Sequence, residues 1–234
     1  TLQKVKEMGY DGVEFAGLFG NAPADVKAMC AEIGLNPISA HVPLQEMLED
    51  IDKVIADYKA IGCEYIVVPY VTEERRPGGD KFMQMIDEIR SVGQKAKEAG
   101  LVLLYHNHDF EFEKLDGEYL LDIMYRDMDA DVLVTQLDTC WVNVGGENPA
   151  AYVAKYSGRI PTVHLKDFRG SKSENMYGLI GVEGSETKAD GTKFMLTPVG
   201  KGCQDFPAIV AAAEEGGADF IHIETMSDTL EVKA

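Results

Sequence analysis

The sequence contains few cysteines and no Cys-X-X-Cys pair. Its four cysteines are widely spaced, at Cys30, Cys63, Cys140 and Cys203. This spacing is typical of reduced thiols inside a cell and does not suggest a disulfide framework or a cysteine-rich zinc site. No signal peptide is visible either, so a cytoplasmic location is expected.

Long apolar runs and an excess of basic residues are also missing. No apolar stretch reaches the roughly 18 residues of a membrane span, so no membrane association is expected. Only 22 Lys and Arg residues face 40 Asp and Glu residues, which leaves a formal net charge of −18. Such a chain repels phosphate backbones, so nucleic acid is not an expected partner. The acidity can also serve solubility alone.

An internal repeat of a helix, a glycine and a short apolar strand runs along most of the chain, with a period of about 30 residues. Apolar spacing predicts helices over residues 2–8, 24–33, 51–61, 82–99 and 206–215. Strands are predicted over residues 11–16, 37–42, 65–71, 101–107, 132–139, 162–167 and 220–225.

Short, apolar strands separated by helices are typical of a parallel sheet that is covered on both faces. We therefore predict an α/β fold, a single (β/α)8 TIM-barrel domain over residues 1–234 that lacks the first strand and the last helix in this chain. A doubly wound open sheet is the alternative, although no Gly-X-Gly-X-X-Gly motif supports it. Residues 168–205 interrupt the repeat as a long loop insertion, which is either functional or without a function.

Polar residues stand at the carboxyl ends of most predicted strands, where a barrel enzyme keeps its active site. Four of the five histidines lie at these ends. The polar residues concerned are Glu14, His41, His106, His108, Asp138, His164, Lys166, Asp167 and Glu224.

A metal centre is the chemistry that these residue types suggest. Asp138, His164 and Glu224 offer one nitrogen and two oxygen ligands, and His106 would add a fourth. His106 and His108 share one face of their strand because side chains alternate along it. By the same rule His222 lies deeper than Glu224 and is expected to be structural. A hydrogen-bonded polar cluster without metal is the alternative.

Five segments in this order resemble the sugar phosphate isomerase/epimerase family of xylose isomerase-like TIM barrels. They are Gly9-Tyr-Asp-Gly-Val-Glu-Phe15, Ser39-Ala-His41, Tyr105-His-Asn-His108, Leu137-Asp-Thr-Cys-Trp141 and Val163-His-Leu-Lys-Asp167, with Pro198-Val-Gly-Lys-Gly202 and Ile223-Glu224 as further matches. The resemblance implies a divalent metal held by His106, Asp138, His164 and Glu224. Manganese is the expected ion, with zinc, cobalt, iron or magnesium as alternatives.

The resemblance also implies roles around the metal. Glu224 is the expected base, and His108 or Lys166 supplies the other proton transfer, because His106 replaces a glutamate of the family. Substrate contacts are expected from Glu14, His41, His108, Trp141 and Lys166. Trp141 can instead pack under the loop, Lys166 can form an ion pair with Asp167 or Glu14, and the pair Arg75-Arg76 is either a phosphate site or a solvated surface pair.

The function predicted first is a metal-dependent isomerase or epimerase that acts on a keto- or aldo-sugar through an enediolate. The alternative is a lyase or dehydratase that cleaves a 3-keto-glycoside or an inosose by β-elimination, which the histidine at position 106 favours. A non-catalytic sugar-binding module is a third hypothesis. A DNA-repair endonuclease shares the fold, but the acidity argues against it. The expected partner is a small sugar, and a homo-oligomer is possible.

Overall fold

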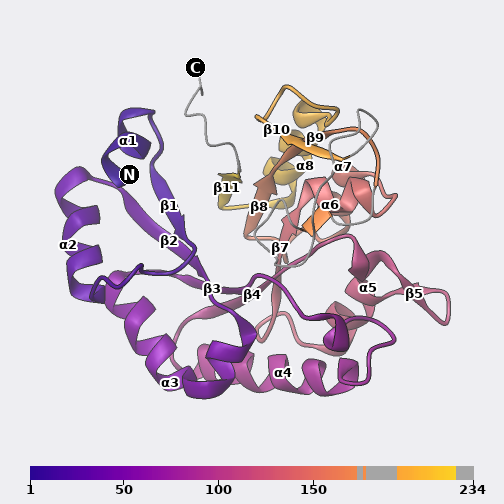
Figure 1. The fold of residues 1–234 in the computed structure, drawn as a ribbon, viewed down its shortest axis with the longest axis horizontal. Helices are drawn as coiled ribbons and strands as arrows, with labels where there is room; N and C mark the ends of the chain where they lie inside the picture. Colours follow the sequence, from indigo (N-terminus) through magenta and orange to yellow (C-terminus); the bar gives the residue numbers. More distant parts are fainter. Residues whose placement is uncertain (173–175, 178–193, 225–234) are drawn as a thin grey trace. The chain divides into compact units, whose positions relative to one another are not determined.

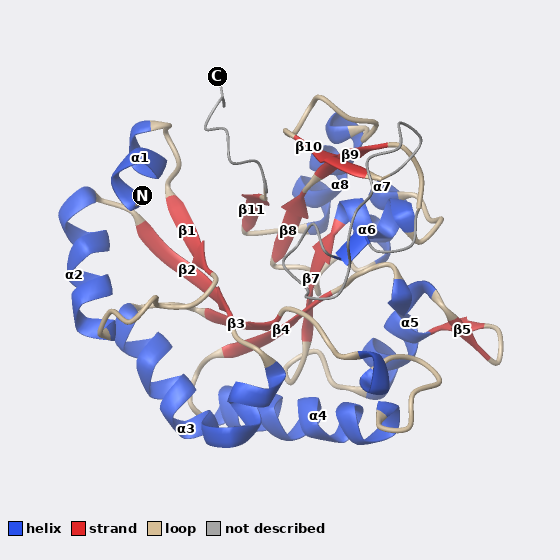
Figure 2. Ribbon diagram, viewed as in Figure 1, coloured by secondary structure: helices blue, strands red, loops and turns tan. Residues whose placement is uncertain are grey.

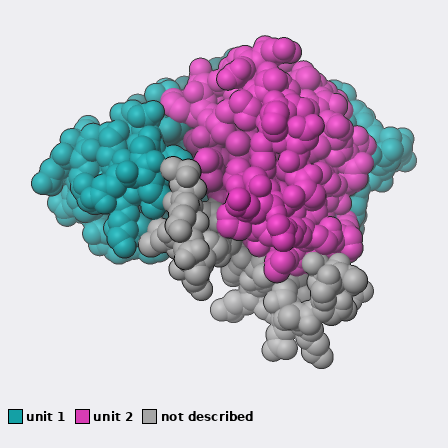
Figure 3. Space-filling model, turned by 90° about the horizontal axis from the view of Figure 1, so that it is seen from above, with its two compact units in different colours: residues 1–136 teal, residues 137–234 magenta. Residues whose placement is uncertain are grey.

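A computed structural model describes residues 1–172, 176–177 and 194–224. The chain forms two compact units, residues 1–136 and residues 137–234, which Figure 3 colours separately. We describe each unit by itself.

The first unit alternates helices with parallel strands, as the repeat in the sequence predicts. Its strands pair in the order β1-β2-β3-β4-β7, and β7 is the strand along which the chain passes into the second unit. The main elements are α1 (Leu2–Glu7), β1 (Gly12–Phe15), α2 (Pro23–Ile33), β2 (Asn36–His41), α3 (Leu44–Ile61), β3 (Tyr65–Val68), α4 (Phe82–Glu98), β4 (Val102–His106), α5 (Leu120–Asp127) and β7 (Val134–Asp138). Short elements lie between them: η1 (Glu73–Arg75), η2 (Phe110–Phe112), β5 (Lys114–Leu115) and β6 (Glu118–Tyr119).

Helices α3 and α4 of the first unit lie along one face of its sheet because each has an apolar stripe. In α4 the buried side chains include Met85, Ile86, Ile89 and Val92, which recur at the spacing of one helical face. Figures 1 and 2 show α2, α3 and α4 following the strands β1 to β4 on this face. The strand ends that carry the polar residues therefore remain accessible to one another at the carboxyl edge of the sheet.

Helix α3 is longer than the sequence predicts, because it begins at Leu44 and not at residue 51. Leu44 and Met47 are buried and add a further turn of apolar contacts. Asp50 interrupts this helix with non-helical backbone angles, φ −156° and ψ 76°. The backbone thus forms two helical segments on either side of Asp50, and the sequence predicted only the second. Its predicted end is correct: Gly62 takes the left-handed conformation with φ 109°, which side chains with a Cβ rarely adopt.

The second unit contains the remaining strands, in the order β7-β8-β11. Its elements are α6 (Thr139–Val144), α7 (Pro149–Lys155), β8 (Thr162–Leu165), β9 (Asp167–Arg169), β10 (Met195–Thr197), α8 (Phe206–Gly216) and β11 (Phe220–Ile223). Strand β11 pairs with β8 in parallel, with His222 opposite His164. All seven predicted strands are therefore present as parallel neighbours in chain order, and the α/β prediction is confirmed.

The predicted loop insertion at residues 168–205 lies partly outside the described residues. Its two described arms form the antiparallel pair β9 and β10. Asp167, which is buried, anchors the segment that follows β10. Its carboxylate accepts hydrogen bonds of 2.6 to 3.3 Å from five backbone N–H groups, those of Phe168, Gly200, Gly202, Cys203 and Gln204. Asp167 is thus a structural anchor and not the partner of Lys166 that the sequence left open.

We predict that Gly202→Ala destabilises the second unit. A Cβ atom at this position would lie 2.1 Å from Asp167 Oδ1 and 2.3 Å from the Phe168 carbonyl oxygen. The backbone must then move away and weaken the N–H bonds to Asp167, which should cost about 2–3 kcal/mol of unfolding free energy. Urea denaturation measures this loss. Gly200→Ala is the control, because only its left-handed φ of 82° opposes a side chain there, at a cost of about 1 kcal/mol. Equal stability of the two variants would contradict the prediction.

The described helices include none with the length and apolar composition that crossing a membrane requires. All four cysteines are free thiols, and three of them are buried.

Candidate active site

A largely buried cluster in the second unit joins four of the residues that the sequence placed at strand ends. We call Asp138, His164, Lys166, His222 and Glu224 the Lys166 cluster. Lys166 Nζ lies 3.1 Å from Asp138 Oδ2 and 2.8 Å from Glu224 Oε1. His164 Nδ1 lies 3.0 Å from Glu224 Oε2. The carboxyl ends of β7, β8 and β11 thus bring two carboxylates, an imidazole and an ammonium group into one contiguous set of contacts.

His222 contacts His164 from a position deeper along β11 than Glu224, as the alternation of side chains along the strand predicts. Its Nδ1 lies 3.2 Å from His164 Nε2. Because His164 Nδ1 faces Glu224 and Nε2 faces His222, both ring nitrogens of His164 have a defined neighbour. Contacts of this kind fix the orientation and the tautomer of an imidazole.

Burial and charge together set the protonation of the cluster. Burial raises the pKa of the Asp138 carboxyl, and the neighbouring ammonium of Lys166 opposes this shift. For Lys166 burial lowers the pKa, but the charges of Asp138 and Glu224 outweigh it and hold the pKa above its ordinary value. Lys166 is therefore a protonated ammonium at neutral pH, and its ion pairs offset the cost of burying these charges.

Asp138 has a second task at the start of α6. Its Oδ1 accepts hydrogen bonds from the backbone N–H groups of Cys140 at 2.8 Å and Trp141 at 3.2 Å. This is the N-cap arrangement that satisfies the first amides of a helix. One carboxylate oxygen therefore orients the side chain and the other, Oδ2, faces Lys166.

Trp141 is fully buried among aromatic side chains. Its ring stacks on Phe194 with centroids 5.4 Å apart and lies in one core cluster with Cys140 and Phe168. Lys166 Nζ is 5.5 Å from the centre of the indole ring. This environment matches the packing role that the sequence left open, and a sugar contact by Trp141 stays a prediction.

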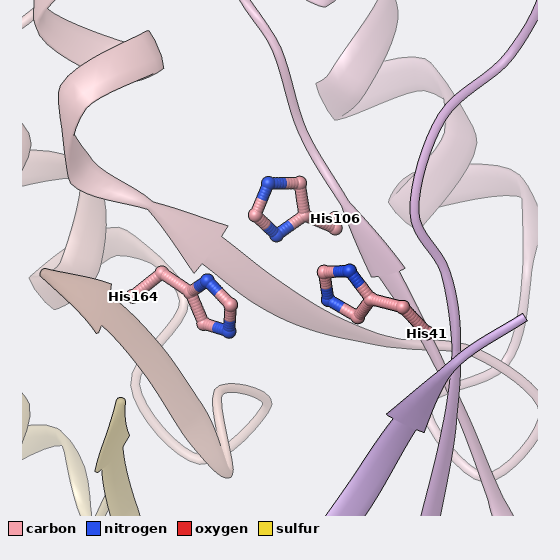
Figure 4. Close-up of side chains that lie close together, drawn as sticks. All are labelled: His41, His106 and His164. Atoms are coloured by element: carbon pink, nitrogen blue, oxygen red, sulfur yellow. The ribbon is translucent and has the colours of Figure 1, made fainter. Parts of the chain in front are cut away.

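The first unit holds a polar network at the carboxyl ends of its own strands. Glu14 accepts hydrogen bonds from Ser39 Oγ at 2.5 Å and from Gln136 Nε2 at 2.6 Å. His41 Nε2 lies 3.0 Å from Glu14 Oε1 and 2.7 Å from Gln136 Oε1. His106 Nδ1 lies 3.0 Å from the same Gln136 oxygen. We call these five residues the Glu14 network; Figure 4 shows the rings of its two histidines, His41 and His106.

The sequence patterns do not identify Gln136, Ser39 or Glu111 as residues of the site, although a signal for Gln136 exists. Gln136 stands two residues before Asp138 on β7, so the alternation of a strand places both side chains on one face. A fully buried glutamine needs hydrogen-bond partners, and this burial is visible only in the structure.

His108 lies beside an aromatic group that also holds Arg76. The His108 ring is 5.4 Å from His106 and stacks parallel to Phe110 at 5.4 Å. Arg76 lies over Phe110, 4.3 Å from the ring centre, and donates a hydrogen bond to the Tyr70 hydroxyl. Arg75 forms an ion pair with Glu88. The two arginines are therefore not a solvated surface pair, because each has a defined side-chain partner.

Glu111 anchors the turn that carries His108. Tyr105 donates its hydroxyl to Glu111 Oε1 at 2.6 Å, and the backbone N–H of His108 donates to Glu111 Oε2 at 2.8 Å. Complete burial raises the pKa of Glu111 to about 8, despite these two hydrogen bonds, which lower it. Glu111 is therefore largely protonated at neutral pH, whereas in the unfolded chain it is ionised.

We predict that Glu111→Gln flattens the pH dependence of stability. A carboxyl whose folded pKa is raised binds its proton more readily in the folded state. Its contribution is full below the unfolded pKa of 4.5 and is lost as pH rises towards about 8. Between these two pH values, each rise of one pH unit should lower the unfolding free energy of the wild type by up to about 1.4 kcal/mol more than it lowers that of the variant. Urea denaturation between about pH 5 and pH 8 tests this, and parallel profiles would contradict it.

Of the residues predicted as ligands, the second unit brings together Asp138, His164 and Glu224. The fourth, His106, belongs to the first unit, and its part in a metal centre stays a prediction. Glu14 and His41 contact each other, and His106 and His108 are neighbours, as the strand alternation predicts. The substrate and catalytic roles of these residues stay predictions.

Comparison with known families gives a match over nearly the whole chain. The model of the xylose isomerase-like TIM barrel family matches residues 2–233. An inosose dehydratase from Geobacillus kaustophilus is 25% identical over 233 residues, which cover 90% of this chain and 74% of the relative. The chain spans only 48% of three further inosose dehydratases, from Clostridium beijerinckii and from Lacticaseibacillus casei.

Solved structures show the same fold. A sugar phosphate isomerase/epimerase from Parabacteroides distasonis superposes with a TM-score of 0.74 at 21% identity, over 98% of this chain and 81% of that one. The IOLI protein, solved with a bound zinc atom, superposes with a TM-score of 0.67 at 16% identity, over 95% of this chain and 81% of that one. The predicted TIM-barrel fold and the resemblance to this family are thus confirmed.

Proposed function

The chain belongs to the xylose isomerase-like TIM barrel family, and we propose that it is a divalent-metal-dependent lyase that eliminates water or an alcohol from an inosose or a related keto-sugar. The observation that carries this proposal is the Lys166 cluster, in which Asp138, Lys166 and Glu224 form consecutive contacts. The inosose dehydratases among the relatives support the reaction class.

The donor atoms of the cluster suit a divalent ion. Two carboxylates and an imidazole, from Asp138, Glu224 and His164, are ligands that zinc, manganese, iron and cobalt accept in proteins. Manganese is the ion expected from the sequence resemblance, and the zinc atom of the IOLI protein makes zinc the alternative to test first. When bound, the ion would polarise a substrate carbonyl and acidify the adjacent C–H bond.

The residues of the chain would then move the protons. Glu224 accepts the proton from the carbon next to the carbonyl, and the electron pair of that C–H bond forms the new double bond as the C–O bond at the β carbon breaks. The leaving oxygen takes a proton from Lys166. Glu224 then passes the proton that it accepted to Lys166, whose Nζ lies 2.8 Å from Glu224 Oε1. Substrate becomes an enone and water or an alcohol, with no net proton change.

Isomerisation or epimerisation, the function predicted first from the sequence, has less support. The curated relatives described above are dehydratases. A symmetric proton exchange also needs a base on each face of the sugar, whereas position 106 carries a histidine in place of the second glutamate.

Product mass distinguishes the two reactions. The purified protein, supplied with zinc or manganese, is incubated with inosose and with 3-keto-glucosides, and products are analysed by mass spectrometry. Elimination predicts a product lighter by one water or one alcohol, with an ultraviolet-absorbing enone. A product of unchanged mass that has exchanged hydrogen with deuterated water would refute the lyase proposal and favour epimerisation.

A further inference from the structure

A cavity of about 720 Å³ lies in the first unit beside the Glu14 network. His41, the last residue of β2, and Pro69, which follows β3, both line it. Residues of helix α3 also line it, as does the loop of residues 16–22, which we call the lip. Binding pockets for drug-sized molecules have volumes of ~300–1,000 Å³, so this cavity has room for a ligand of two rings and not only for one monosaccharide.

The lip of the cavity presents an aromatic ring to solvent. Phe19 is 88% exposed, the most exposed of the large apolar side chains in the described part of the chain. Its backbone has a φ of +51°, a left-handed conformation that is rare for a bulky residue. The loop holds this shape through Asn21, whose backbone and side-chain N–H groups both donate to the Leu18 carbonyl oxygen. Strained positions of this kind cluster at ligand-binding loops.

The charges of the lining favour a neutral, hydroxylated ligand. Glu46 and Asp57 contribute two carboxylates, and Lys53, which forms an ion pair with Asp57, contributes one ammonium group. The lining is therefore net acidic and repels phosphate. Carboxylates accept hydrogen bonds from sugar hydroxyls, and an aromatic face offers a flat apolar surface to a second ring.

We propose that this cavity is a subsite for the second ring of a glycoside, with Phe19 stacking on that ring while the first ring extends towards His41. The inference rests on the proposed function in one respect, namely that the first ring is a sugar. Binding in the cavity requires neither a metal nor turnover.

The test compares two probes that differ only in the second ring. Isothermal titration calorimetry measures the Kd of phenyl β-glucoside and of methyl β-glucoside on the wild type in the presence of EDTA. We expect phenyl β-glucoside to bind about tenfold more tightly, from ring stacking together with buried apolar area. Phe19→Ala should reduce this preference to less than about twofold, and Phe19→Tyr should keep it.

Met83→Ala is the matched control, since Met83 is an apolar side chain on α4 that is 65% exposed and does not line the cavity. It should leave both Kd values unchanged. Equal binding of the two probes, no binding of either, or an unchanged preference in Phe19→Ala would overturn the subsite. Metal content and product mass remain unaffected by these outcomes, so failure of the subsite is distinguishable from failure of the lyase proposal.

Discussion

Asp138→Asn is expected to abolish metal binding, and to lower stability because it removes one of the two carboxylates that pair with Lys166. The wild type should hold about one divalent ion per chain, and the variant close to none, because an amide oxygen lacks the charge that the ion requires. Metal activation supplies several kcal/mol of transition-state stabilisation, and each 1.36 kcal/mol is tenfold in rate, so turnover should fall about a thousandfold. Inductively coupled plasma mass spectrometry measures the metal.

The choice of asparagine separates the two tasks of Asp138. Its side-chain oxygen can still accept from the N–H groups of Cys140 and Trp141, so the cap of α6 is kept. Asp205→Ala is the matched control: Asp205 caps α8 by accepting from Ala208, and this variant loses a helix cap outside the Lys166 cluster. It should melt earlier and keep its metal. Equal metal in Asp138→Asn and wild type, or no metal uptake by either, would contradict the proposed centre.

Lys166→Met is expected to remove turnover without removing the metal. The lysine carries the proton that the leaving oxygen needs, and loss of a positioned acid costs about a hundredfold to ten-thousandfold in rate. Asp138, His164 and Glu224 remain as ligands, so the metal content should stay near that of the wild type. Single-turnover assays under metal saturation, with metal content measured on the same samples, check both expectations.

A loss of stability is the alternative explanation for lost turnover that this experiment must exclude, because Lys166 is buried between Asp138 and Glu224. Removing one partner of a buried ion pair costs about 3–5 kcal/mol. Lys166→Arg keeps the charge and should restore most of the stability, but its larger, planar guanidinium does not place a proton where the compact ammonium does and should leave turnover low. Lys4→Met, at an exposed position of α1, is the surface control. Turnover restored by arginine would show that Lys166 acts through charge alone.

The sequence alone determined the order of the strands and which polar residues stand at their ends. The reason is local: a buried strand is a short apolar run, a helix has its own period, and Gly62 marks a helix end by its conformation. Alternation along one strand also placed His106 beside His108, and His222 beneath Glu224, without any knowledge of the partner strands.

Only the tertiary structure decided which of these residues contact one another. Lys166 is adjacent to Asp167 in the chain, yet it pairs with Asp138 and Glu224, which are distant in the chain. Asp167 instead binds five backbone N–H groups, most of them in the segment after β10. Such pairings follow from strand register and from which segment packs over a strand end, and no local pattern encodes either. Burial acts in the same way, since the raised pKa of Glu111 arises from neighbours that only the folded chain assembles around it.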